Sequence, residues 1–124
     1  MSLPSNQQQQ NGAQWHWGEG TKYALEAGKS LILINGAAAI SILTFVGNHP
    51  SKTYGIFCAI NLFAFGSLFG AIFFGVSYEA QLWYGNGLER RARIWHWRAY
   101  IFAAVSALLF VLGMCAATQS LLQG

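Results

Sequence analysis

The feature that most constrains this chain is a run from Tyr54 to Tyr78 that contains no charged residue and no proline. An α-helix rises about 1.5 Å per residue, so this run is long enough to cross a hydrocarbon core of about 30 Å. Two further apolar runs flank it, SLILINGAAAISILTFVG at 30–47 and AYIFAAVSALLFVLGMCAA at 99–117. The sequence therefore predicts an all-α integral membrane protein with three transmembrane helices, at about residues 28–48, 54–78 and 98–119.

The composition points to the same class of protein. Hydrophobic residues make up 54% of the 124 residues and charged residues only 9%, whereas a soluble domain has about a quarter of its residues charged. The formal charge is +3, and no basic stripe alternates with exposed aromatic side chains, so we expect no nucleic-acid partner. The partner that this composition predicts is the lipid bilayer.

The N-terminal residues differ from the rest of the chain. Residues 1–18 are polar and rich in glutamine, and such a segment buries too little apolar surface to fold, so we expect a disordered tail that ends in an interfacial Trp-His-Trp triplet. Residues 19–124 form a single three-helix domain. The sequence Asn48-His49-Pro50-Ser51 predicts a turn, because Pro50 disfavours helix at His49. The first two spans are therefore expected to form an antiparallel hairpin.

The second span carries small residues on one side and an amide on the other. Gly66 and Gly70 share one side, and glycines at this spacing let helix backbones approach closely in lipid. Asn61 lies on the opposite side. An amide facing hydrocarbon has no partner there, so we expect Asn61 to point toward another helix. In a closed bundle its partner would be Asn35 or a first-span hydroxyl, whereas in a pore Asn61 would line the water-filled path. Because both sides suit contact, we predict that this span is the middle helix of three.

The third span has a side of small residues that includes Ala103 and Gly113, opposite a plain apolar side. A small-residue side favours close helix packing. We therefore expect the third helix to lie at the edge of the bundle with this side inward. The residues predicted to make helix–helix contacts are Gly66, Gly70, Asn61, Asn35, Ala103 and Gly113.

Residues 79–97 form a basic and aromatic juxtamembrane segment that contains Gly85-Asn86-Gly87. Two structures suit it: an interfacial helix among the lipid headgroups, or extensions of the second and third helices that meet at the glycines. Tryptophan favours the membrane interface, and arginine gains about 1 kcal/mol near an anionic lipid surface. We predict anionic lipid headgroups at the arginines and interface anchors at Trp15, Trp17, Trp83, Trp95, Trp97, Arg90, Arg91, Arg93 and Arg98.

The basic residues also predict an orientation. Six of the seven Lys and Arg residues precede the first span or lie between the second and third spans, and only Lys52 lies between the first and second. With three spans, the N-terminal flank and the second connection share a side, which the positive-inside rule assigns to the cytoplasm. The C-terminus is then outside. A glycine-rich chain of low charge is typical of a bacterial inner membrane, which is the expected location.

His16 and His96 are the candidates for a cofactor or metal site, since they share a side in this orientation. Each stands between two tryptophans, and interfacial anchoring accounts for both triplets, so we expect no metal and no cofactor. Cys58 and Cys115 lack metal-ligand spacing and lie inside predicted spans, where free cysteine behaves as a small apolar residue. We interpret both as packing residues.

Motifs of enzymes and coupled carriers are missing from the sequence. It contains no nucleophile elbow, paired carboxylates, CxxC, HExxH or phosphate loop, and the apolar runs lack the ionisable groups of coupled carriers. The leading hypothesis is a small non-catalytic integral membrane protein that acts by helix–helix association with itself or with a larger membrane partner. The alternative is a holin-like or toxin-like membrane-permeabilising protein, which this chain is similar to in size and three-span outline. An enzyme or cofactor carrier would rest on His16 and His96 alone.

Overall fold

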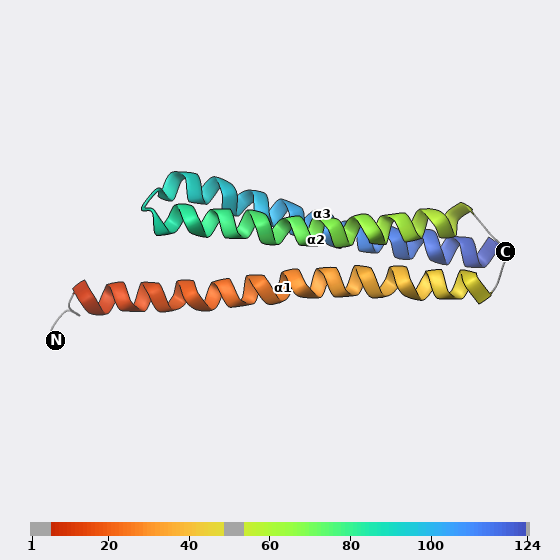
Figure 1. Cartoon of the computed structure of the whole chain (residues 1–124), viewed down its shortest axis with the longest axis horizontal. Helices are drawn as coiled ribbons and strands as arrows, with labels where there is room; N and C mark the ends of the chain where they lie inside the picture. Colours follow the sequence, from red (N-terminus) through yellow and green to blue (C-terminus); the bar gives the residue numbers. More distant parts are fainter. Residues whose placement is uncertain (1–5, 49–53, 124) are drawn as a thin grey trace.

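The computed structural model describes residues 6–48 and 54–123, which form three long helices (Figure 1). They are α1 (Asn6–Asn48), α2 (Tyr54–Gly85) and α3 (Glu89–Gln123). Each contains a stretch that is long and apolar enough to cross a membrane, Thr21–Asn48, Tyr54–Gly85 and Glu89–Leu122. The prediction of an all-α chain with three helices of membrane-spanning length is confirmed.

Helix α1 begins earlier than the sequence predicts. It starts at Asn6, so residues 6–18 are helical, whereas the sequence analysis expects disorder over 1–18. Glutamine and alanine are good helix formers, and adding a residue to an existing helix needs no new nucleus. The apolar part of α1 supplies that nucleus. Hydrophobicity by itself does not predict such an extension of the helix into a polar segment. The residues predicted to turn after Asn48 fall outside the described part of the chain.

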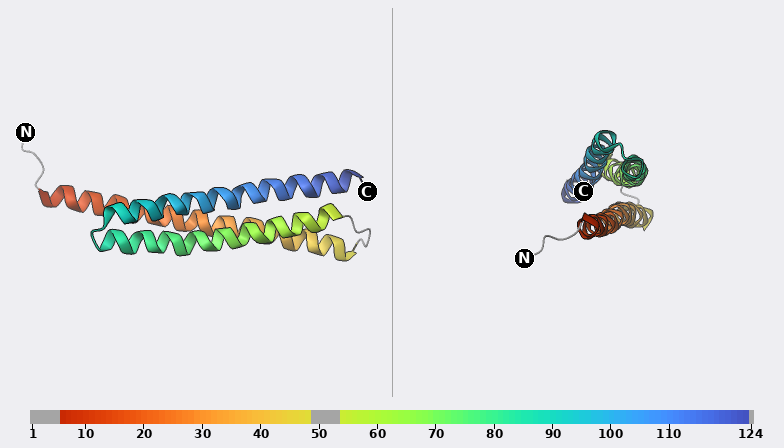
Figure 2. Two further views of the ribbon diagram at one scale, coloured as in Figure 1. Left: turned by 90° about the horizontal axis from the view of Figure 1, so that it is seen from above. Right: turned by 90° about the vertical axis from the view of Figure 1, so that its left-hand side faces the viewer.

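Helices α2 and α3 extend past the apolar runs and meet at the glycines, which was the second of the two alternatives for residues 79–97. The connection is short because the amide of Gly87 donates to the Tyr84 carbonyl at 3.0 Å and the amide of Leu88 donates to the Trp83 carbonyl at 3.0 Å. Gly87 has a φ of 72°, a conformation that favours glycine. A helix end closed in this way turns the chain back at once, so α3 runs antiparallel along α2 (Figure 2).

One stripe of α2 makes the contacts with both neighbours. Its buried residues follow one another at intervals of three or four, as Ile56, Ala59, Phe63, Gly66, Gly70, Phe73, Val76 and Ala80. The opposite side, which includes Asn61 and Leu68, is exposed. Within the chain, α2 therefore makes its helix contacts on one side only, and its opposite side meets neither α1 nor α3. The end-on view shows the reason: α1 and α3 lie around the same stripe instead of on either side of α2 (Figure 2).

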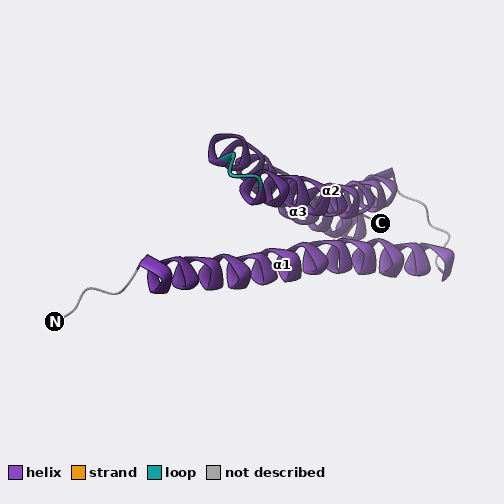
Figure 3. Ribbon diagram, turned by 60° about the vertical axis from the view of Figure 1, so that its left-hand side comes forward, coloured by secondary structure: helices purple, strands orange, loops and turns teal. Residues whose placement is uncertain are grey.

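Helix α1 is the least covered of the three. Among its described side chains and glycines, Gly28 and Asn35 are buried. Its path is antiparallel to α2, because Gly28 approaches Phe73 while Asn35 approaches Gly66. Toward the α2–α3 turn, α1 diverges from the other two helices (Figure 3). Helices α2 and α3 thus stay packed together up to their turn, whereas α1 packs on them most closely at mid-length (Figure 3).

Candidate functional site

A buried polar junction joins the three helices at mid-length. The side chains of Asn35 on α1 and Ser106 on α3 are both fully buried. Asn35 Nδ2 donates to the Leu31 carbonyl at 2.9 Å and lies 3.4 Å from Ser106 Oγ. Ser106 Oγ in turn donates to the carbonyl of Gly66 on α2 at 2.8 Å. One continuous set of hydrogen bonds therefore connects α1, α3 and α2, and we call Asn35, Ser106 and Gly66 the polar junction.

Glycine at position 66 is what allows Asn35 to enter the junction. A Cβ built on Gly66 would collide with the side-chain oxygen of Asn35, so the amide occupies the space that any other residue would fill. One turn further, a Cβ on Gly70 would come within 3.0 Å of Ile32 Cγ1. Both glycines of the GxxxG pair therefore face α1. The close approach lets a polar side chain of one helix reach the backbone of another.

On the side of the junction toward the C-terminal end of α3, an aromatic side chain packs against small residues. Phe63 is fully buried, and its ring lies against Gly113 of α3, where an added Cβ would come within 2.8 Å of the ring. The ring also contacts Phe110 with centroids 5.6 Å apart. Ala38 and Ala39 of α1 complete this layer. Ala103 lies on the other side of the junction and contacts the cluster of Phe73, Val76 and Ala99.

Asn61 does not take part in the junction. Its side chain is exposed and its Nδ2 donates to the Phe57 carbonyl of its own helix at 2.8 Å. The expectation that Asn61 points toward another helix of the chain is wrong, because α1 and α3 both lie on the opposite stripe of α2. Asn35 makes the interhelical contacts instead, and its partner is Ser106.

The predicted interface anchors divide into pairs and single exposed residues. The guanidinium of Arg91 lies 5.1 Å from the centroid of the Trp83 ring, and that of Arg98 lies 4.9 Å from the centroid of the Trp95 ring. Both are cation–π pairs. Trp97 is 67% exposed, and Arg90 and Arg93 are exposed as well. The side chains of Trp15 and Trp17 lie outside the described part of the structure.

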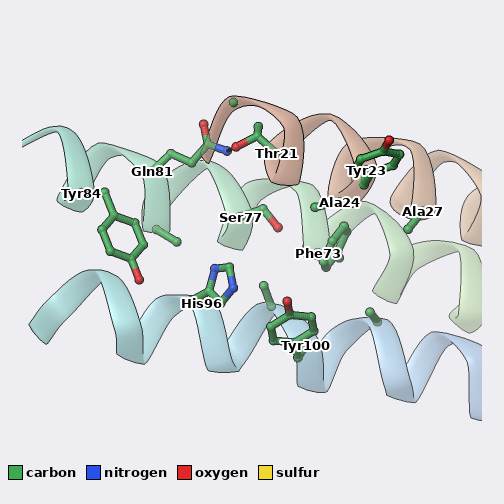
Figure 4. Close-up of a pocket in the computed structure, with 14 residues that line it drawn as sticks. Thr21, Tyr23, Ala24, Ala27, Phe73, Ser77, Gln81, Tyr84, His96 and Tyr100 are labelled. Carbon is green, nitrogen blue, oxygen red and sulfur yellow. Dashed lines mark hydrogen bonds between the residues drawn. The ribbon is translucent and has the colours of Figure 1, made fainter. Parts of the chain in front are cut away.

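A cleft of about 760 Å³ opens where α1 diverges, between the polar junction and the α2–α3 turn. Its lining nearest the junction is apolar and includes Ala27, Phe73 and Ala103. Toward the turn it includes His96, and Figure 4 shows this side chain projecting from α3 into the gap between the helices. From the sequence, His96 is expected at the membrane surface, and no motif predicts the cleft.

The junction residue that sequence reasoning missed is Ser106. Ser106 lies between Ala103 and Gly113 on the small-residue side of α3, and this position is the signal in the sequence that identifies it. Cys58 and Cys115 are free thiols, and the described residues contain no group of three metal-ligating side chains.

No protein-family model, curated protein or solved structure matches this chain.

Proposed function

We propose that this chain is a non-catalytic integral membrane protein that acts by helix–helix association, with itself or with a larger membrane protein. The observation that carries the proposal is the outward position of Asn61 in the apolar part of α2. Its amide meets only the Phe57 carbonyl among the described residues. In a bilayer the exposed amide faces hydrocarbon, where unsatisfied polar groups are costly. A helix from outside the chain would supply the missing partner.

The surroundings of Asn61 support this proposal. The exposed side of α2 also presents Ala64, Ala71 and Gly75, and a Cβ built on Gly75 would meet nothing within 4 Å. Small residues beside an amide allow a second helix to come close enough for a hydrogen bond. We call Asn61, Ala64, Leu68, Ala71 and Gly75 the outer stripe of α2.

Asn61→Leu is expected to weaken the association while leaving the fold of the single chain intact. Interhelical hydrogen bonds in membranes average about 0.6 kcal/mol with a maximum near 1.7, which corresponds to a dissociation constant raised about threefold to twentyfold. The measurement is the mass of the complex extracted in mild detergent, followed over a dilution series.

Ser41→Ala is the matched control for this measurement. Ser41 is also exposed and also bonds a carbonyl of its own helix, Ala37, at 2.8 Å, but it lies on α1 and away from the outer stripe. We expect its complex to dissociate like that of the unmodified protein. A monomer at every concentration, or a complex that Asn61→Leu leaves unchanged, would contradict the proposal.

The second candidate function, a membrane-permeabilising protein, is favoured by the same outward amide. If several copies surrounded a water-filled path, Asn61 would be one of its few polar lining groups. A membrane-potential dye in expressing bacteria separates the two functions. If expression depolarises the bacteria and Asn61→Leu abolishes this depolarisation at normal expression, the protein forms a pore. If expression leaves the membrane potential unchanged, the result supports association.

For the orientation, we propose that the N-terminus and the α2–α3 turn are cytoplasmic and the C-terminus is outside, in a bacterial inner membrane. The six-to-one distribution of basic residues supports this. Arg90, Arg91 and Arg93 are exposed next to the turn, where they would meet anionic lipid headgroups. In a variant without its native cysteines, a cysteine replacing Ser51 should be labelled from outside, and one replacing Asn86 only after permeabilisation. The reverse pattern would overturn the orientation.

A further inference from the structure

The cleft between α1, α2 and α3 has the size and the lining of a small-molecule site. Its volume of about 760 Å³ lies within the range of about 300–1,000 Å³ that is typical of ligand pockets. Its inner end is closed by the contact of Gly28 with Phe73, where an added Cβ would come within 2.7 Å of the ring. Beyond that contact, α1 is far enough from α3 to leave the space unfilled by the chain itself.

The side chains of the cleft are graded from apolar to polar. Near the junction, Ala27, Phe73 and Ala103 present only carbon. Toward the α2–α3 turn the lining includes His96 and Gln81, and Gln81 Nε2 donates to Thr21 Oγ1 at 3.0 Å across the opening between α2 and α1. A ligand that matches this grading has an apolar chain and one hydrogen-bonding head.

The charges of the lining side chains restrict which kind of head group the ligand can have. Among the side chains that the structure describes, no lysine, arginine, aspartate or glutamate lines the cleft. An ionised head placed between apolar helices without a counter-charge is strongly disfavoured. The ligand is therefore uncharged. The Gln81 amide already donates to Thr21, and the lining also includes the His96 imidazole and the hydroxyls of Ser77, Tyr84 and Tyr100. Because these groups can donate hydrogen bonds, they suit a head that accepts them through oxygen.

The shape of the polar end favours a flat head. His96 lies with its ring edge-on to Tyr100, with centroids 5.0 Å apart, and edge-on to Tyr84 at 6.5 Å. All three rings border the cleft (Figure 4). Aromatic side chains attract another flat ring through offset or edge-to-face contacts, and they give less contact to a branched, flexible head.

We propose that this cleft binds a lipid-soluble quinone, a planar uncharged ring with carbonyl oxygens and an apolar chain. The ring lies among Tyr84, His96 and Tyr100, with a carbonyl oxygen accepting a hydrogen bond from the His96 imidazole. The chain follows the apolar walls at Ala103 and Phe73. The site is open between helices, so the ligand enters from the bilayer. This binding does not depend on the association proposed for the outer stripe.

The test uses the full chain in lipid nanodiscs and a benzoquinone that carries a ten-carbon alkyl chain. Retention of the probe by protein-loaded nanodiscs, in excess of empty ones, is expected to saturate near one probe per chain. Decanoate, which has a similar chain and a charged head, should show no saturable excess. Dioctanoylglycerol, which is uncharged but lacks the ring, should bind at least about tenfold more weakly, since it forgoes the ring contacts. Equal binding of dioctanoylglycerol would overturn the assignment of a ring.

Two variants with one control locate the binding. Ala103→Leu fills the cleft and is expected to weaken binding at least about tenfold, whereas the neighbouring Ala104 is exposed outside the cleft, so Ala104→Leu should bind like the unmodified chain. His96→Phe keeps a ring but removes the donor, and should weaken binding about fivefold. His96 lies in the open end, so this variant tests the site even where Ala103→Leu fails to fold. Non-saturable retention by the unmodified protein, or affinity unchanged in folded His96→Phe, would overturn the proposal.

Discussion

Gly66→Ala is expected to lower the free energy of unfolding by about 2 kcal/mol, within the range of about 1–3 kcal/mol that overfilled contacts cost. The added methyl group collides with the Asn35 side chain. Asn35 cannot rotate away without cost, because its Nδ2 is bonded to the Leu31 carbonyl and it is fully buried. The backbones of α1 and α2 must therefore separate, and the contact from Ser106 to the Gly66 carbonyl changes with them. Unfolding by a denaturing detergent in mixed micelles measures the loss.

Gly75→Ala is the matched control on the same helix. Gly75 is exposed, and a Cβ built there meets nothing within 4 Å. Alanine is also a better helix former than glycine by about 1 kcal/mol. At a dilution where the chain is monomeric, so that the outer stripe has no partner, this variant should therefore be as stable as the unmodified chain or more stable. Equal destabilisation by the two substitutions would show that Gly66 faces lipid.

Phe63→Ala is expected to have the largest effect of a single truncation, a loss of about 3 kcal/mol. Phe→Ala in soluble cores costs about 3–5 kcal/mol. The lower end applies here because the surroundings of an unpacked helix in a bilayer are themselves apolar, which leaves mainly the lost contacts and the cavity. Phe63 is fully buried against Gly113 and Phe110. The same detergent titration measures the change.

Phe65→Ala removes the same atoms from the same helix at a position that is 53% exposed. We expect its free energy of unfolding to fall by less than about 1 kcal/mol, since surface substitutions generally have small effects. If Phe65→Ala lowered the free energy of unfolding as much as Phe63→Ala, this would show that the buried side of α2 is not the side that contains Phe63.

The sequence was sufficient to predict the helices but not which side of each helix is inward. The lengths of the apolar runs predicted three helices of membrane-spanning length because the bilayer thickness fixes that length. The inward side of a soluble helix is identified by the contrast between apolar and polar faces. In α2 both Phe63 and Phe65 suit lipid as well as protein, so that contrast is missing. Small residues were the remaining guide, and they occur on both sides, at Gly66 and at Gly75.

The sequence alone also does not predict the different roles of the Asn35 and Asn61 side chains. Asn35 and Asn61 are chemically identical, and both lie within apolar runs. Which one is buried depends on where α1 and α3 lie around α2, and this follows from the packing of all three helices together. The cleft depends on the same long-range geometry, because it exists only where α1 diverges. Ala24 and Ala27 of α1 and Ala99 of α3 line this cleft, but only the fold brings these two helices together.

Asn35 enters the bundle because Gly66 leaves room for it, and combining Asn35→Ala with Gly66→Ala tests this relation. Each single variant should be destabilised, the first by losing its hydrogen bonds and the second by the collision. In the double variant the methyl group of position 66 fills space that the amide has vacated. Unfolding titrations of the four proteins should therefore give a double variant that is more stable than the sum of the single losses predicts, by about 1–2 kcal/mol. Losses that add to within about 0.5 kcal/mol, as expected for distant sites and for Asn35→Ala combined with Gly75→Ala, would contradict the account.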